Sequence, residues 1–213
     1  MGNIGGRNVF TGIIEAIGRI DVIESDCKGS RLFIEAGKLK LVEVNSGDSI
    51  STSGVCLTAT EFKNGGFWAD VSPETAELTT LGDKQVGDHV NLEKSMTLST
   101  PLGGHLVSGH VDGIGHIVEI EKVARFWRVV VAAPDRLVRY IAVKGSICID
   151  GTSLTVNKID SAQFEITIIP QTWEETVFSV YSVGSAVNLE VDLIARYVER
   201  LMSNDDIPKD SHG

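Results

Sequence analysis

The 213-residue sequence has a formal net charge of −10, with 42% hydrophobic and 23% charged residues. This length suits one large domain or two small ones. The acidic balance argues against a nucleic-acid or anionic-membrane partner, because both need a basic surface. No segment approaches the roughly 18 apolar residues that span a bilayer, and three widely separated cysteines form neither a disulfide framework nor a metal motif. We expect a cytoplasmic protein without a metal site.

Most of the first hundred residues are predicted to form short strands. Turn-forming residues such as Asn45-Ser46-Gly47 separate the strands, and the spacing predicts a small closed barrel or a sandwich. Two brief helices are expected, one after Gly37 and one that starts at Pro73 with Ser72 as its cap. The runs rich in Ile, Val, Phe and Thr are 10–24, 30–36, 48–62, 67–72 and 89–94.

The second half of the chain repeats the first at a constant offset of 97 residues. FTGIIEAIGRI (10–20) aligns with VSGHVDGIGHI (107–117), and SISTSGVCLT (49–58) aligns with SICIDGTSLT (146–155). Over positions 10–96, 24 of 87 residues are identical without a gap. A period this long indicates a domain rather than a solenoid repeat. We expect one domain over 10–103 and a homologous one over 104–191.

The last predicted element has no counterpart in the repeat. The segment DLIARYVERLM (192–202) is typical of an amphipathic helix. A helix this short is marginal alone in water, so its apolar stripe must pack on its own barrel or on a neighbouring subunit. We favour an oligomerisation helix over 192–203, with an N-terminal extension over 1–9 and a disordered tail over 204–213. The stripe comprises Leu193, Ile194, Tyr197, Val198, Leu201 and Met202.

Five motifs in this order, inside a tandem duplication, resemble the riboflavin synthase family across residues 10–203. They are FTGIIE, GDSISTSGVCLTAT, GGHLVSGHVDG, KGSICIDGTSLTVN and VNLEVDLIARYVERL. The resemblance implies an all-β fold of two tandem homologous Greek-key six-stranded β-barrels plus a C-terminal α-helix. It also implies a homotrimer, with the active site shared between the N-terminal barrel of one subunit and the C-terminal barrel of its neighbour.

The resemblance further implies a transferase that catalyses the last step of riboflavin biosynthesis. Two molecules of 6,7-dimethyl-8-ribityllumazine exchange a four-carbon unit, giving riboflavin and 5-amino-6-(D-ribitylamino)uracil. Two like substrates need two like pockets, and holding them face to face can lower the barrier by about 7–11 kcal/mol. No cofactor is required, because lumazine supplies both an acidic methyl group and an electrophilic ring carbon. Some family members dock onto lumazine synthase, which makes that enzyme a candidate partner.

Cys56 and Ser153 occupy the same position in the two copies. A lone cysteine in an apolar strand is ordinarily a small buried hydrophobe, but the resemblance implies substrate contact. We assign Cys56 to substrate binding, with nucleophilic help at the acceptor lumazine as a second role. Water and a ribityl hydroxyl remain alternative nucleophiles.

His105 and His110 are the candidate acid–base groups. On a strand, a metal-binding pair would need a spacing of two, whereas a spacing of five places the two rings on opposite faces unless Gly109 bends the chain. Imidazole titrates near neutral pH and therefore suits a general base. Since the resemblance places the second histidine beside the substrate, His110 is the first choice.

Other polar residues match family positions at or near the site. The resemblance implies catalytic roles for Ser49, Asp192 and Thr155, and a binding role for Lys144. For Lys144 and Asp192, a solvated charge or a helix cap is the simpler alternative. The partner of His110 in the first copy is Ile13, so the two pockets differ and can separate the carbon donor from the acceptor.

The implied substrate-binding residues fall in matched segments of the two copies, where backbone groups suit the amide-like edge of lumazine. The first set comprises Gly12, Ile13, Ile14, Cys56, Leu57, Thr58, Asp70, Val71, Ser72, Pro73, Glu74 and Thr75. The second set comprises Gly109, His110, Val111, Lys144, Ser153, Leu154, Thr155, Thr167, Ile168, Ile169, Pro170, Gln171 and Thr172.

Ser53 departs from the family pattern, which commonly has asparagine in N-G-x-C-L-T. Serine is also an acceptable turn residue.

Two other functions compete with this interpretation. A non-catalytic lumazine- or flavin-binding antenna protein would share the duplicated fold, but such relatives typically lose the cysteine and histidines that this chain keeps. A barrel-type flavin oxidoreductase would normally carry a nicotinamide-binding domain with a glycine-rich loop. No such loop occurs in the sequence.

Overall fold

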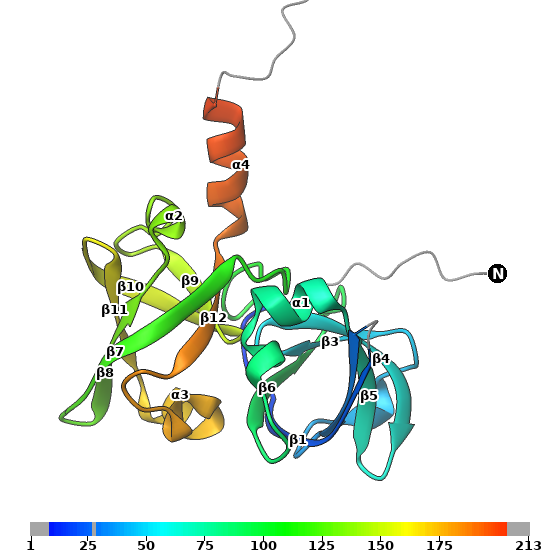
Figure 1. The fold of residues 1–213 in the computed structure, drawn as a ribbon. Helices are drawn as coiled ribbons and strands as arrows, with labels where there is room; N and C mark the ends of the chain where they lie inside the picture. Colours follow the sequence, from blue (N-terminus) through cyan, green and yellow to red (C-terminus); the bar gives the residue numbers. More distant parts are fainter. Residues whose placement is uncertain (1–8, 27–28, 204–213) are drawn as a thin grey trace, which may run out of the picture.

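The structure, a computed structural model, describes residues 9–26 and 29–203. These residues form two closed antiparallel barrels that lie side by side, followed by a C-terminal helix (Figure 1). Apart from Val9, the predicted extension 1–9 and the predicted tail 204–213 lie outside the described residues.

The two barrels have the same strand order. The first, called the N-barrel below, closes in the order β1-β2-β5-β4-β3-β6, and the second, the C-barrel, closes in the matching order β7-β8-β11-β10-β9-β12. The predicted duplicated all-β fold is therefore confirmed. The N-barrel strands are β1 (Ala16–Asp26), β2 (Gly29–Glu35), β3 (Ser49–Thr52), β4 (Val55–Lys63), β5 (Gly66–Val71) and β6 (His89–Lys94). The C-barrel strands are β7 (Gly113–Val123), β8 (Phe126–Ala132), β9 (Ser146–Ile149), β10 (Thr152–Asp160), β11 (Gln163–Ile168) and β12 (Ala186–Val191).

Two of the predicted strand runs divide differently in the structure. The run 48–62 is a hairpin, because Ser53 and Gly54 take positive φ angles of 45° and 78° and turn β3 into β4. Two successive positive φ angles are the geometry of a tight hairpin turn. The run 10–24 also breaks, since β1 begins only at Ala16 and the preceding residues leave the barrel.

Short helices close the barrel ends. Ser72 caps α1 (Pro73–Leu78) as predicted, because its Oγ accepts a hydrogen bond from the Thr75 backbone N–H at 3.0 Å. The helix expected after Gly37 is only a 3-10 turn, Leu41–Glu43, whose start has no side-chain cap. The remaining short elements are η2 (Thr80–Asp83), α2 (Asp135–Val138), α3 (Pro170–Glu175) and η3 (Val177–Val180).

Each barrel encloses its own apolar core, and a pair of asparagines joins the barrels. Asn188 of β12 donates from Nδ2 to Ser53 O at 2.8 Å and accepts the Thr80 N–H on Oδ1 at 2.8 Å. Its counterpart Asn91 makes the mirror-image bonds to Asp150 O and the Val177 N–H. Both asparagines are 1% exposed, so these bonds lie in a dry interface.

The C-terminal helix α4 (Leu193–Met202) projects beyond the two barrels (Figure 1). The side chain of Asp192 caps its first turn by accepting the Ile194 N–H at 3.0 Å. Glu199 anchors the helix to the C-barrel through Tyr140 Oη and through Arg139 Nη1 at 2.8 Å. Within the described part of the chain, no helix has the length and apolar character needed to cross a membrane.

We predict that Asn188→Ala destabilises the protein by about 2–5 kcal/mol, because an unsatisfied buried polar group costs about 1–3 kcal/mol and two would be left. Urea unfolding measures this loss. The matched control is Asn45→Ala, in an exposed turn, which should change stability by about 0.5 kcal/mol or less. Equal losses of stability in the two variants would contradict a role of the buried Asn188 bonds in joining the barrels.

Candidate functional site

Two backbone arms cross between the barrels. The arm that precedes β1 reaches the C-barrel, where Gly12 O accepts the Ser153 N–H at 2.8 Å. The arm that precedes β7 reaches the N-barrel, where Gly109 O accepts the Cys56 N–H at 2.8 Å. The arms also pair with each other through Phe10 and Val107. Each barrel is therefore contacted by the chain segment that leads into the other barrel.

Glycine is required where each arm meets its barrel. A Cβ atom on Gly12 would lie 2.5 Å from Ser153 Cβ, and one on Gly109 would lie 2.6 Å from Cys56 Cβ. Both glycines also have a φ of 77°, which L side chains rarely adopt. The arms can approach Ser153 and Cys56 this closely only because neither glycine has a side chain.

A buried glutamate fixes each arm. Glu93 of β6 accepts the Thr11 N–H and hydroxyl, both at 2.7 Å, and the Gly12 N–H at 3.0 Å. Glu190 of β12 makes the same three bonds to Ser108 and Gly109. The two carboxylates are only 3% and 2% exposed, and burial raises the pKa of both, that of Glu93 to about 7.

An open strand edge faces each arm. Pairing of β5 with β2 continues to Val71, whereas pairing with β4 stops at Ala69. In the same way, β11 pairs with β8 up to Ile168 but with β10 only up to Ile166. Among the residues that the structure describes, no strand pairs with the backbone groups beyond these points on that side. These groups can bind the amide-like edge of a planar heterocycle.

On the N-barrel, the structure groups Cys56, Ser49 and the arm that carries His110. Ser49 pairs with Thr58 across β3 and β4, close to the half-buried Cys56. Val111, which follows the exposed His110, packs against the N-barrel core. The predicted segments 56–58 and 109–111 therefore meet in one region.

The hydroxyl of Ser49 is available to a ligand. Its Oγ is buried and has no hydrogen-bond partner among the described residues. A cavity of about 590 Å³ opens beside it. Ile13, Glu93 and Lys94 also line this cavity.

On the C-barrel, the histidine beside the site is His105. Its Nδ1 lies 2.6 Å from Ser153 Oγ, while its Nε2 is buried and has no partner in the part of the chain that the structure describes. Burial lowers the pKa of His105, and the negative charge of Asp192 opposes this shift. Thr155 lies two residues beyond Ser153 on β10, and the backbone of Lys144 bonds to the next residue, Val156. The predicted segments 12–14 and 153–155 therefore meet in this second region.

The five predicted catalytic residues therefore do not form one cluster within a chain. His110, Cys56 and Ser49 belong to the N-barrel region, whereas Thr155 and Asp192 belong to the C-barrel region. Sequence reasoning named His105 but ranked it below His110. No local signal in the sequence could have raised its rank, because its contact with Ser153 joins residues 48 positions apart.

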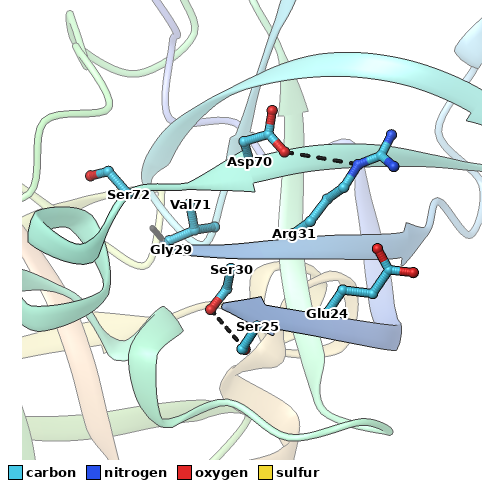
Figure 2. Close-up of a pocket in the computed structure, with 8 residues that line it drawn as sticks. All are labelled: Glu24, Ser25, Gly29, Ser30, Arg31, Asp70, Val71 and Ser72. Carbon is cyan, nitrogen blue, oxygen red and sulfur yellow. Dashed lines mark hydrogen bonds and ion pairs between the residues drawn. The ribbon is translucent and has the colours of Figure 1, made fainter. Parts of the chain in front are cut away.

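The barrels differ in how they fill the space beside the open edge. In the N-barrel, a cavity of about 600 Å³ lies between the ends of β1, β2 and β5, next to Asp70 and Ser72 (Figure 2). Ser30 lies at its wall, and the matching residue in the C-barrel is Trp127. The indole of Trp127 stacks on Trp173 with ring centres 4.6 Å apart. At these matched positions the C-barrel has two indole rings where the N-barrel has the smaller Ser30 and Ala76.

The raised pKa of Glu93 predicts a pH-dependent stability. The folded protein holds this proton more tightly than the unfolded chain, so the stabilisation is fully present below about pH 4.5 and is lost as pH rises through about 7. The shift corresponds to about 3 kcal/mol. We would measure the free energy of unfolding in urea between about pH 5 and 8. In Glu93→Gln this free energy should fall less steeply as the pH rises, and the part of the fall that remains comes from Asp150, whose pKa is about 6. The exposed Glu77→Gln serves as the control, and an unchanged slope in Glu93→Gln would disprove the assignment.

Comparisons with known proteins agree with this geometry. The family model described as "Lumazine binding domain" matches residues 11–95 and again 108–192. Riboflavin synthase of Photobacterium phosphoreum is 42% identical over 91% of this chain and 89% of its own length. Riboflavin synthases of Actinobacillus pleuropneumoniae and Bacillus subtilis are 44% and 40% identical, each over 91% of this chain and 90% of their own length.

Solved structures show the same architecture. LumP complexed with riboflavin has a TM-score of 0.80 and 25% identity, covering 85% of this chain and 98% of its own. LumP complexed with 6,7-dimethyl-8-(1'-D-ribityl) lumazine has a TM-score of 0.78 and 24% identity over the same shares. With two matched lumazine-binding domains and relatives that align over nearly their whole length, the chain belongs to the riboflavin synthase family.

Proposed function

We propose that the chain catalyses the dismutation of two 6,7-dimethyl-8-ribityllumazine molecules into riboflavin and 5-amino-6-(D-ribitylamino)uracil. The observation that carries this proposal is the paired site: each barrel has one open strand edge, on β5 or β11, and the strand next to it, β4 or β10, bonds to one of the two crossed arms. Riboflavin synthases at about 40% identity over about 90% of their length support the same reaction. The enzyme moves a four-carbon unit from a donor to an acceptor lumazine, so no external oxidant or reductant enters the balance.

In this proposal, the backbone of each barrel binds one pteridine and the side chains separate the two roles. The backbone groups of Asp70–Thr75 and of Thr167–Thr172 hold the heterocyclic edges. His110 and Cys56 act in the N-barrel region, where the counterparts in the C-barrel region are Ile13 and Ser153. A shared backbone with unlike side chains can treat two identical molecules differently.

His105 is a second acid–base candidate. Its lowered pKa favours the neutral imidazole at physiological pH, which can accept a proton. With Nδ1 engaged by Ser153 Oγ, the buried Nε2 is the atom that faces a ligand. Asp192 and Lys144 would complete the charges around this region.

We also propose a homotrimer in which the N-barrel of one subunit and the C-barrel of its neighbour form each active site. The exposed stripe of α4 supports this assembly: Tyr197 is 65%, Leu201 81% and Met202 76% exposed. Apolar side chains of this number on a ten-residue helix need a partner surface. Lumazine synthase as a docking partner and the cytoplasm as the place of action belong to the same proposal.

The decisive experiment supplies the purified protein with the lumazine alone. We expect riboflavin absorbance to appear while two lumazines disappear for each riboflavin formed. Tight binding of lumazine without conversion would instead identify an antenna protein, the alternative favoured by the likeness to LumP. Chromatography of the reaction mixture would detect the uracil product in equal amount.

Sedimentation velocity tests the assembly. The whole protein should sediment at three times the chain mass of 22.9 kDa, and Leu201→Asp should shift it towards the monomer with loss of turnover, because a charge would interrupt the apolar stripe. Val86→Asp, which places the same charge at an exposed apolar residue of the N-barrel, is the control. A fully active Leu201→Asp monomer would show that one chain holds a complete site.

A further inference from the structure

The arm that carries His110 is held on two sides. Its inner side contacts the N-barrel, through the bond from the Cys56 N–H to Gly109 O. Its outer side contacts the end of β12, through the three hydrogen bonds from Ser108 and Gly109 to Glu190. These contacts fix the backbone up to Gly109. They leave His110 itself to be fixed by something else.

Arg196 of α4 supplies that contact. Its Nη2 donates to His110 O at 3.0 Å and to Asp112 Oδ2 at 2.7 Å, so one guanidinium nitrogen forms a bracket between the His110 backbone and the Asp112 side chain. Asp112 Oδ2 also accepts the Val191 N–H at 2.8 Å, which connects this bracket to the last residue of β12.

The other arm has no such bracket. The position that matches Arg196 in the first copy is Ser99, and the residue that matches Asp112 is Glu15. Glu15 forms an ion pair with Lys94 of β6, 3.3 Å away, rather than with a residue of a following helix. Among the residues that the structure describes, the contact with α4 is therefore made by the arm that carries His110 and not by the arm that precedes β1.

Charge gives Arg196 a second effect on the same arm. Nη2 lies 4.0 Å from Glu190 Oε1, and its positive charge opposes the rise in the pKa of that buried carboxyl group. An ionised Glu190 accepts the bonds from Ser108 and Gly109 more strongly than a neutral acid does. Arg196 therefore supports the arm both directly and through Glu190.

We infer that Arg196 is a positioning residue for His110, through which the C-terminal helix sets the placement of the N-barrel catalytic arm. The inference rests on the proposed function, because it assumes that His110 acts on the substrate. It assigns α4 a role inside the site, separate from holding subunits together.

The test compares Arg196→Gln with Glu199→Gln in the full chain. Both substitutions remove a contact between α4 and the C-barrel, but only Arg196 touches the His110 arm. We expect Arg196→Gln to lower kcat on the order of 10–100-fold, as a small misplacement of a reacting group can, with KM for lumazine changing less. Glu199→Gln should retain kcat, and both variants should sediment as the wild type does.

A second readout follows His110 without turnover. In protein labelled at histidine with ¹³C, the His110 imidazole signal is assigned by its absence in His110→Gln. Arg196→Gln should change the chemical shift of this signal and leave the signals of His89 and His116 in place. Asp112→Asn leaves the surface of α4 unchanged and should also lower kcat and change the His110 signal. This variant provides the test if Arg196→Gln fails to assemble.

Unchanged kcat and an unmoved His110 signal in Arg196→Gln would overturn the inference. So would an equal loss in Glu199→Gln, because helix docking would then explain both. If Arg196→Gln fails to assemble, an active Asp112→Asn with an unmoved signal overturns it as well. Absence of turnover in the wild-type protein is a different result, because it contradicts the proposed function. The His110 signal would then test only the contact between Arg196 and the arm.

Discussion

Two buried carboxylates hold the crossed arms, and the rest of the site depends on them. Glu93 and Glu190 each accept three hydrogen bonds from an arm, at positions where the adjoining glycine permits direct contact with the other barrel. A carboxylate satisfied in this way can remain buried, whereas an unpaired one could not. The arms bond to β4 and β10, the strands next to the open edges of β5 and β11, so the same bonds that connect the barrels also position the residues beside these edges.

The duplicated backbone provides symmetry, and the side chains remove it. Matched positions carry Cys56 and Ser153, Ile13 and His110, Ser30 and Trp127. Where the two halves carry the same residue, the hydrogen bonds are repeated, as in those of Asn91 and Asn188. Where the residues differ, the chemical groups beside the two pockets differ as well. A reaction between two identical molecules needs both properties, since the substrates must be held alike and treated unlike.

Much of this architecture was predictable from the sequence because it depends on local signals. The offset of 97 residues predicts two domains, and Ser72-Pro73 predicts a capped helix. The crossing of the arms was not predictable, because it depends on hydrogen bonds between residues far apart in the sequence, such as Gly12 and Ser153. For the same reason, the pairing of His105 with Ser153 was missed, although both residues had been named. The assignments of site residues to roles remain predictions.

The unequal distribution of indole rings gives the molecule an internal optical label. Trp68 lies alone in the N-barrel beside Phe33, while Trp127 and Trp173 stack in the C-barrel with ring planes 2° apart. Stacked indoles couple their intense electronic transitions, so the C-barrel contributes an exciton signal to the far-ultraviolet circular dichroism that a solitary indole cannot produce. Unfolding of the C-barrel can thus be distinguished from unfolding of the N-barrel in the unmodified protein. Because Trp173 lies in α3 together with Pro170 and Gln171, the same signal would also respond to ligand binding at these two residues.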